Sequence, residues 1–161
     1  MIASKSRLVA PLALCFAMLP AWAGVAASHH DVLIDMFVWW NSAYKHSDGF
    51  TEEAFARYFT PDAVLRVNGE DRCKGLAQWA AHFRDIQAKT EMVEIQLPFI
   101  AEFESTSGDH IFTHHLIKAR EHGKESWERV MAYAVVRDGR IALINEVSVA
   151  YAAVGGDARK P

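Results

Sequence analysis

Apolar residues in the first half of the chain recur every three or four positions, as they do along one face of a helix. This spacing predicts helices over residues 29–46, 51–59 and 75–89. We expect the apolar stripe of each helix to face a common core. In the first helix the stripe consists of Leu33, Met36, Phe37, Trp40 and Tyr44.

After residue 90 the pattern changes to alternation of apolar and polar residues, which is typical of strands. It predicts four long strands over residues 91–103, 111–120, 126–136 and 141–151, and a short strand over 63–68 lies between the second and third helices. The pairs His122-Gly123 and Asp138-Gly139, and a polar stretch at 105–109, favour hairpin turns between these strands. Helices followed by an antiparallel meander indicate the α+β class, with helices on one face of a curved sheet.

The first 23 residues have the pattern of a secretory signal peptide. Lys5 and Arg7 precede an apolar run over residues 8–20, and Ala21-Trp22-Ala23 then provides small residues before a cut. The apolar run is too short to span a bilayer as a helix, so no membrane span is expected. We therefore expect a periplasmic or secreted protein, with a flexible segment over 24–30, one domain over 31–151 and a flexible tail over 152–161.

Composition is consistent with one globular domain: of 161 residues, 51% are hydrophobic and 23% are charged, with a formal net charge of −3. Cleavage after Ala23 would remove two basic residues and leave 138 residues with a charge of −5. This acidic balance argues against nucleic acid as a partner. Because Cys15 would leave with the signal peptide, Cys73 would remain alone and no internal disulfide is expected.

Three segments together resemble a known superfamily: YFTPDAVLRVNG at 58–69, KGLAQWAAHF at 74–83 and VVRDGRIALINEV at 135–147. In their order and spacing they are similar to the nuclear transport factor 2-like superfamily, in its SnoaL-like branch of small bacterial proteins. Polyketide cyclases, ketosteroid isomerases and epoxide hydrolases are relatives in this group. Over residues 31–151 the resemblance implies a cone-shaped α+β barrel, with three N-terminal helices packed on a strongly curved antiparallel sheet. It also implies an apolar pocket, and homodimers through the outer face of the sheet.

Strand pairing suggests which side chains line such a pocket. A two-residue turn at Asp138-Gly139 would pair Met131 with Glu146, and paired residues point to the same face. The face expected to line the pocket carries Trp127, Arg129, Met131, Tyr133, Ile144, Glu146 and Ser148. The opposite face, which suits a partner subunit or further core, carries Val130, Ala132, Ala134, Leu143, Asn145, Val147 and Val149.

Glu146 is the leading candidate for a catalytic residue. A carboxylate among Met131, Ile144 and Tyr133 would be desolvated, which raises its pKa toward use as a general acid or base. In the epoxide-hydrolase and cyclase relatives an acid on this last strand acts on the substrate, and Glu146 occupies the matching place. The alternatives are a structural ion pair with Arg129, diagonally across the ladder, and plain solvent exposure.

His114 and His115 are adjacent on a strand, so one faces inward and the other outward. A tight turn at His122-Gly123 would put His114 beside Met131, and one extra loop residue would put His115 there. The resemblance favours His115, because the epoxide hydrolases carry an arginine at this position. Either histidine could relay protons near neutral pH, or could simply be a hydrogen-bonded residue of the sheet.

Asn68 and Arg66 share one face of the short strand. Asn68 matches a polar position that orients water or substrate in the epoxide hydrolases, although an Asn before a Gly is also a simple turn former. On the first helix Trp40 and Tyr44 lie on the inner stripe, where Tyr44 could donate a hydrogen bond to a ligand or serve only as core.

The chain also departs from both kinds of relative. Ile117 stands where the epoxide hydrolases carry a second acid, and it is expected only to line the pocket. The two acids of the ketosteroid isomerases, which would lie near Val67 or Asn68 and near Met131, are missing. Neither reaction therefore carries over intact. No metal site is expected, because His29-His30 and His114-His115 lack the spacing of a ligand set.

These features predict an exported enzyme without a cofactor that uses acid–base chemistry of the isomerase, dehydratase, lyase or cyclase type. Its substrate would be a small hydrophobic or aromatic molecule. Glu146 would act as base or acid and His115 or His114 would relay protons. Positioning of the substrate oxygen falls to Asn68, Arg129 and Tyr44. Two alternatives stay open: a protein that binds a hydrophobic ligand without turnover, and a dimeric structural or accessory domain.

Overall fold

The computed structural model of the chain describes residues 29–151. The expected signal peptide and C-terminal tail lie outside these residues, as does most of the segment 24–30. His29 and His30 belong to the first helix and not to a flexible segment. The elements are α1 (His29–Ala43), α2 (Glu52–Phe55), β1 (Phe59–Val67), β2 (Glu70–Lys74), α3 (Leu76–Lys89), β3 (Met92–Ile95), β4 (Ala101–Glu104), β5 (His110–Glu121), β6 (Lys124–Arg137) and β7 (Arg140–Ala150).

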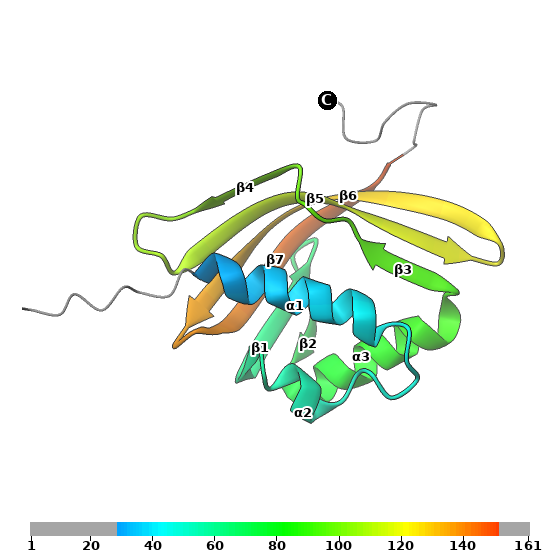
Figure 1. Cartoon of the computed structure of the whole chain (residues 1–161), viewed down its shortest axis with the longest axis horizontal. Coiled ribbons are helices and arrows are strands. Elements are labelled where there is room, and N and C mark those ends of the chain that lie inside the picture. Colours follow the sequence, from blue (N-terminus) through cyan, green and yellow to red (C-terminus); the bar gives the residue numbers. More distant parts are fainter. Residues whose placement is uncertain (1–28, 152–161) are drawn as a thin grey trace, which may run out of the picture.

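The seven strands form one sheet in the order β2-β1-β7-β6-β5-β3, and β4 pairs with another stretch of β5. The α+β class is confirmed, with the helices on one side of the sheet (Figure 1). Two details of the prediction are wrong. The sheet is mixed, since β1 runs parallel to β7 while the other pairs are antiparallel. It is also not strongly curled (Figure 1).

Element boundaries differ from the prediction where local chemistry competes with periodicity. Helix α2 ends at Phe55, and β1 starts at Phe59, inside the stretch predicted to be helical. The predicted strand over 91–103 is divided into β3 and β4. Pro98 lies between them and has no N–H to donate to a ladder. Strand β2, which was not predicted, follows a turn that lies one residue earlier than expected.

Three two-residue hairpin turns have the same backbone form. Asn68-Gly69, His122-Gly123 and Asp138-Gly139 all have positive φ at both residues. Such turns twist in the sense of the flanking strands, and Asn-Gly and Asp-Gly favour them. The predicted turns at His122-Gly123 and Asp138-Gly139 are confirmed, because Glu121 pairs with Lys124 and Arg137 with Arg140.

A β-bulge in the last hairpin changes the predicted faces. The register of β6 and β7 shifts after Val136, so that Val135 pairs with Leu143 and Ala142 is skipped. Because side chains alternate with period two, one extra residue moves all of β6 relative to β7. Glu146 consequently pairs with Ala132 and not with Met131. The residues of β7 that were predicted to face the pocket do so. In β6 the predicted residues face outward, and their neighbours in the sequence face the pocket instead.

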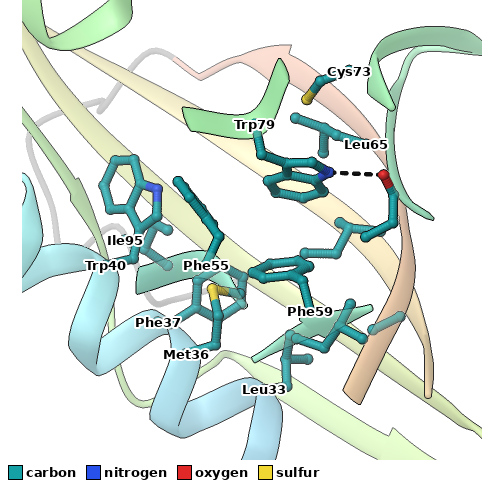
Figure 2. Packing of buried hydrophobic residues seen from close by; sticks show 14 of the residues in the cluster. Leu33, Met36, Phe37, Trp40, Phe55, Phe59, Leu65, Cys73, Trp79 and Ile95 are labelled. Atoms are coloured by element: carbon teal, nitrogen blue, oxygen red, sulfur yellow. Dashed lines mark hydrogen bonds between the residues drawn. The ribbon is translucent and has the colours of Figure 1, made fainter. Parts of the chain in front are cut away.

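The core is centred on aromatic side chains between the helices and β1. Trp79 of α3 is fully buried, and its ring lies 4.3 Å from that of Phe59. The indole N–H of Trp79 donates a 3.0 Å hydrogen bond to the main-chain oxygen of Ala63 (Figure 2). This contact joins α3 to β1 and so fixes two walls of the cavity described next. Cys73 is buried nearby as a free thiol.

Candidate functional site

A cavity of about 440 Å³ lies between α1, α3 and the inner face of the sheet. Its walls are mainly apolar and aromatic, as is typical of a small-molecule site. Helix α1 contributes Met36, Phe37 and Trp40, and α3 contributes Trp79, His82, Phe83 and Ile86. The sheet contributes the apolar residues Leu65, Val67, Val93, Ile95, Ile117, Ala119 and Ile144.

The polar residues of the cavity come mainly from one set of inward-facing strand positions. Glu146 of β7 lies beside Val67 of β1, and both line the cavity. His115 of β5 and Glu128 of β6 occupy the next rows of the same face. Ser126 and Glu121 follow toward the tip of the β5–β6 hairpin, where both are exposed and mark the rim of the site.

Glu146 is partly buried, and its side chain has no hydrogen bond or ion pair within residues 29–151. Burial, and to a smaller extent the negative charge of Glu128, raises the pKa of this carboxyl group from 4.5 to about 7. The alternative prediction, that Glu146 forms a structural ion pair with Arg129, is wrong. Arg129 lies on the other face of β6, with its guanidinium 4.5 Å from the ring of Tyr151.

His115 lies in the cavity wall and is 1% exposed. Its ring packs against those of Phe37 and Phe99, with centroids 5.6 and 5.4 Å away, and its Nδ1 is 3.2 Å from the hydroxyl of Thr113. Burial, and to a smaller extent the neighbouring His114, lowers the pKa of His115 to about 4. Its ring is therefore uncharged near neutral pH, which suits a neutral hydrogen-bonding group better than a carrier of positive charge.

His114 faces away from the cavity. The tight turn pairs it with Met131, as predicted, but the bulge places Met131 on the outer face. The Nε2 atom of His114 is buried and finds no hydrogen-bond partner in the described part of the chain. The structure thus places His115, which the resemblance favoured, in the cavity wall.

Three predicted binding residues line the cavity: Trp40, Ile117 and Ile144. Arg129, Met131 and Tyr133 do not, because the bulge turns them outward. Met131 is 65% exposed. Tyr133 packs against Phe112 on the outer face, with ring centroids 5.8 Å apart.

Arg66, Asn68 and Tyr44 also lie outside the cavity wall, and each has a structural partner. Arg66 donates to Asp71 at 2.6 Å on the exposed side of the β1–β2 hairpin. The hydroxyl of Tyr44 contacts Thr90, both at its side-chain oxygen and at its main-chain oxygen. Since Thr90 lines the cavity, Tyr44 supports the site from behind.

Several polar residues of the cavity were not predicted, among them Arg72, His82 and Glu128. His82 lies between Trp79 and Ile86 on the helix, so helical spacing alone could have identified it. Arg72 required knowledge of β2, and Glu128 required the correct register of β6. No group of three or more His, Cys, Asp or Glu side chains in the described residues could hold a metal ion. Likewise, no helix within these residues is long and apolar enough to cross a bilayer.

Several solved structures are similar to this fold. An NTF2-like protein of unknown function from Exiguobacterium sp. 255-15 matches with a TM-score of 0.60 and 16% identity, over 74% of this chain and 98% of that one. IdmH, a proposed polyketide cyclase from Streptomyces antibioticus, matches with a TM-score of 0.58 and 17% identity, over 76% and 92% of the two chains. A proposed polyketide cyclase from Pseudomonas putida KT2440 matches with a TM-score of 0.59 and 14% identity, over 75% of this chain and 91% of that one.

At such identities these similarities establish the fold alone. Among curated proteins, none matches the sequence. The family model of the SnoaL-like domain, however, matches residues 39–144, which run from the end of α1 through α3 to the first half of β7 and stop two residues before Glu146. The chain belongs to the SnoaL-like domain family.

Proposed function

We propose that this protein catalyses acid–base chemistry, without a cofactor, on a small hydrophobic or aromatic molecule held in the cavity. The observation that carries the proposal is the carboxyl group of Glu146, which lies without a partner in the described residues among apolar walls. Its pKa of about 7 lets it accept and return a proton at neutral pH. Isomerases, dehydratases, lyases and cyclases all use such a step. Export rests on the sequence of residues 1–23 and is part of the proposal.

Each cavity wall has a definite part in this mechanism. Trp40, Phe83 and the sheet residues exclude water and hold the body of the substrate. Glu146 in its ionised form removes a proton from carbon and in its protonated form returns one. His115, being uncharged, would offer a hydrogen bond to a substrate oxygen through the ring nitrogen that Thr113 does not occupy.

A generic proton-transfer probe tests this role without knowledge of the natural substrate. In nitrobenzisoxazole a base removes the ring C–H proton and the N–O bond breaks. The electron pair passes to oxygen and yields a coloured cyanonitrophenolate. We expect the wild-type protein to accelerate this elimination, with a rate that rises through about pH 7 as Glu146 ionises.

Glu146→Gln should remove this acceleration while the exposed control variant Glu94→Gln retains it. An equal rate in Glu146→Gln and wild type would contradict the proposed role. The same cavity also suits a binding protein without turnover. Native mass spectrometry of the purified protein, showing a bound apolar molecule with no rate on the probe, would favour that alternative.

We also propose that a second copy of the chain covers the outer face of the sheet. Phe103, Met131, Val147 and Val149 are exposed there, between 58% and 65%. An apolar face of this kind is a frequent interaction surface. The buried Nε atom of Arg129 has no hydrogen-bond partner among residues 29–151. It lies on the same face and would gain an acceptor from a partner subunit.

A further inference from the structure

Two carboxyl groups face the cavity without a counter-charge. Glu146 and Glu128 lie on adjacent strands of the inner face, separated by the row that contains Val130 and Ser148. Neither side chain has an ion pair or hydrogen bond within the described part of the chain. Glu146 is partly buried, whereas Glu128 is exposed, and Glu121 adds a third carboxylate, also exposed, at the rim.

The positive groups of the cavity do not balance these acids. Arg72 is the only arginine or lysine in the described cavity wall, and it pairs with Glu70 at 3.1 Å. Burial lowers the pKa of His82, with Asp85 opposing and Arg72 reinforcing the shift. The pKa of His115 is lowered to about 4. Both rings are therefore uncharged near neutral pH, and the charges of the cavity wall that have no counter-charge are negative.

We propose that the ligand of this cavity carries a positively charged nitrogen on its apolar or aromatic body. This inference rests on the proposed function in that the cavity binds a small molecule, and it adds the charge of that molecule. A carboxylate in an apolar wall attracts a cation strongly, because the surroundings screen the charge poorly. The aromatic side chains of Trp40 and Phe83 line the same cavity, and the faces of such rings are favourable surfaces for a cation.

Three probes with the same naphthalene body separate charge from shape: naphthylmethylamine, naphthylmethanol and naphthoate. Binding is followed by calorimetry and by the fluorescence of Trp40 and Trp79, both in the cavity wall. We expect the amine to bind about tenfold more tightly than the alcohol, as for a charged hydrogen bond, and the carboxylate to bind most weakly. Affinity for the amine should increase from about pH 6 to about pH 8, because protonated Glu146 must first lose its proton. Affinity for the alcohol should stay constant.

Matched variants locate the effect. Glu146→Gln should bring the affinity for the amine down to that of the alcohol. Glu128→Gln, which removes the more distant charge, should reduce the affinity for the amine about fivefold at low salt. Neither variant should change the affinity for the alcohol. The exposed Glu94→Gln should behave as wild type, since Glu94 lies outside the cavity.

The possible failures are distinguishable. If the alcohol binds as tightly as the amine, or the carboxylate binds best, the inference is wrong while the cavity remains a site for apolar ligands. If none of the three probes changes the tryptophan fluorescence or releases heat, both the inference and the proposed function are wrong. Preference for the amine together with an unchanged elimination rate in Glu146→Gln would support the inference and overturn the catalytic role.

Discussion

The side-chain amide of Asn68 pairs with both main-chain groups of Ser148. Its Oδ1 accepts from the N–H of Ser148 at 3.1 Å, and its Nδ2 donates to the oxygen of Ser148 at 3.4 Å. The main-chain N–H of Asn68 also donates to the oxygen of Glu146 at 2.9 Å. β1 ends at Val67, so the amide continues the ladder one step beyond its end. Asn68 thereby holds the segment that carries Glu146, without itself lining the cavity.

Asn68→Gly tests this positioning role. Gly accepts the positive φ of 53° at this turn, so the variant removes the amide contacts without straining the backbone. We expect a loss of about 1 kcal/mol in the free energy of unfolding, for exposed neutral hydrogen bonds. The elimination rate should fall several-fold while the affinity for naphthylmethanol stays the same. Urea denaturation and probe kinetics measure both.

Asp138→Gly is the matched control, since Asp138 has a φ of 52° in the same type of turn, away from the cavity. It should leave the elimination rate unchanged. If Asn68→Gly and Asp138→Gly behave alike, Asn68 serves the turn alone and has no positioning role.

The free energy of unfolding should depend on pH through Glu146. Its folded-state pKa of about 7 lies above the ordinary value of 4.5, so between these values the folded state holds a proton that the unfolded chain has released. Stability therefore falls as pH rises from about 4.5 to about 7. Glu146→Gln removes this term and should be more stable than wild type at pH 8, by up to about 3 kcal/mol, with little difference at pH 4.

Urea denaturation at several pH values tests this window, with Glu94→Gln as the exposed control. A constant stability difference between Glu146→Gln and wild type across that range would show that the carboxyl group is not desolvated in the folded protein.

His115 should act in the opposite direction on the acid side. Its folded-state pKa of about 4 lies below the ordinary 6.5, so the unfolded chain binds a proton first as pH falls. The free energy of unfolding is highest above about pH 6.5. It decreases toward pH 4 by about 3 kcal/mol for this fully buried ring. His115→Gln, which does not titrate, should lose less stability over this range. The exposed control His46→Gln should follow wild type, and an equally steep decrease in His115→Gln would contradict the burial of a neutral ring.

How far the sequence predicts this site depends on one residue of register. Helical spacing correctly predicts that Trp40 faces the cavity. The residue types of Asp138-Gly139 correctly predict a two-residue turn. The bulge beyond Val135 has no such local signal, and at the same place the register of β7 with β1 shifts as well. It moved Met131 outward and brought Glu128 into the cavity.

The contacts of two asparagine side chains are a second feature of the structure that the sequence pattern does not predict. Asn41 of α1 pairs with both main-chain groups of Ile95, at 2.8 and 2.9 Å, in the way that Asn68 pairs with Ser148. Both contacts join residues more than fifty positions apart in the sequence. Periodicity can place such residues on a helix or in a turn, but the partner that gives them a role is set by tertiary structure.

The outer face of the sheet provides the last prediction. Val147 is 59% exposed and lies beside Met131, which is 65% exposed. If a second copy covers this face, Val147→Glu places a buried charge in the interface of each copy, and desolvation of two like charges opposes association. We expect a dimer for wild type and a monomer for Val147→Glu in light scattering after size exclusion, with the far-ultraviolet spectrum unchanged. Val38→Glu is the matched control, because Val38 is 56% exposed on α1 and lies away from this face. A wild-type monomer at micromolar concentration, or a Val147→Glu variant that still dimerises, would show that a second copy does not cover these side chains.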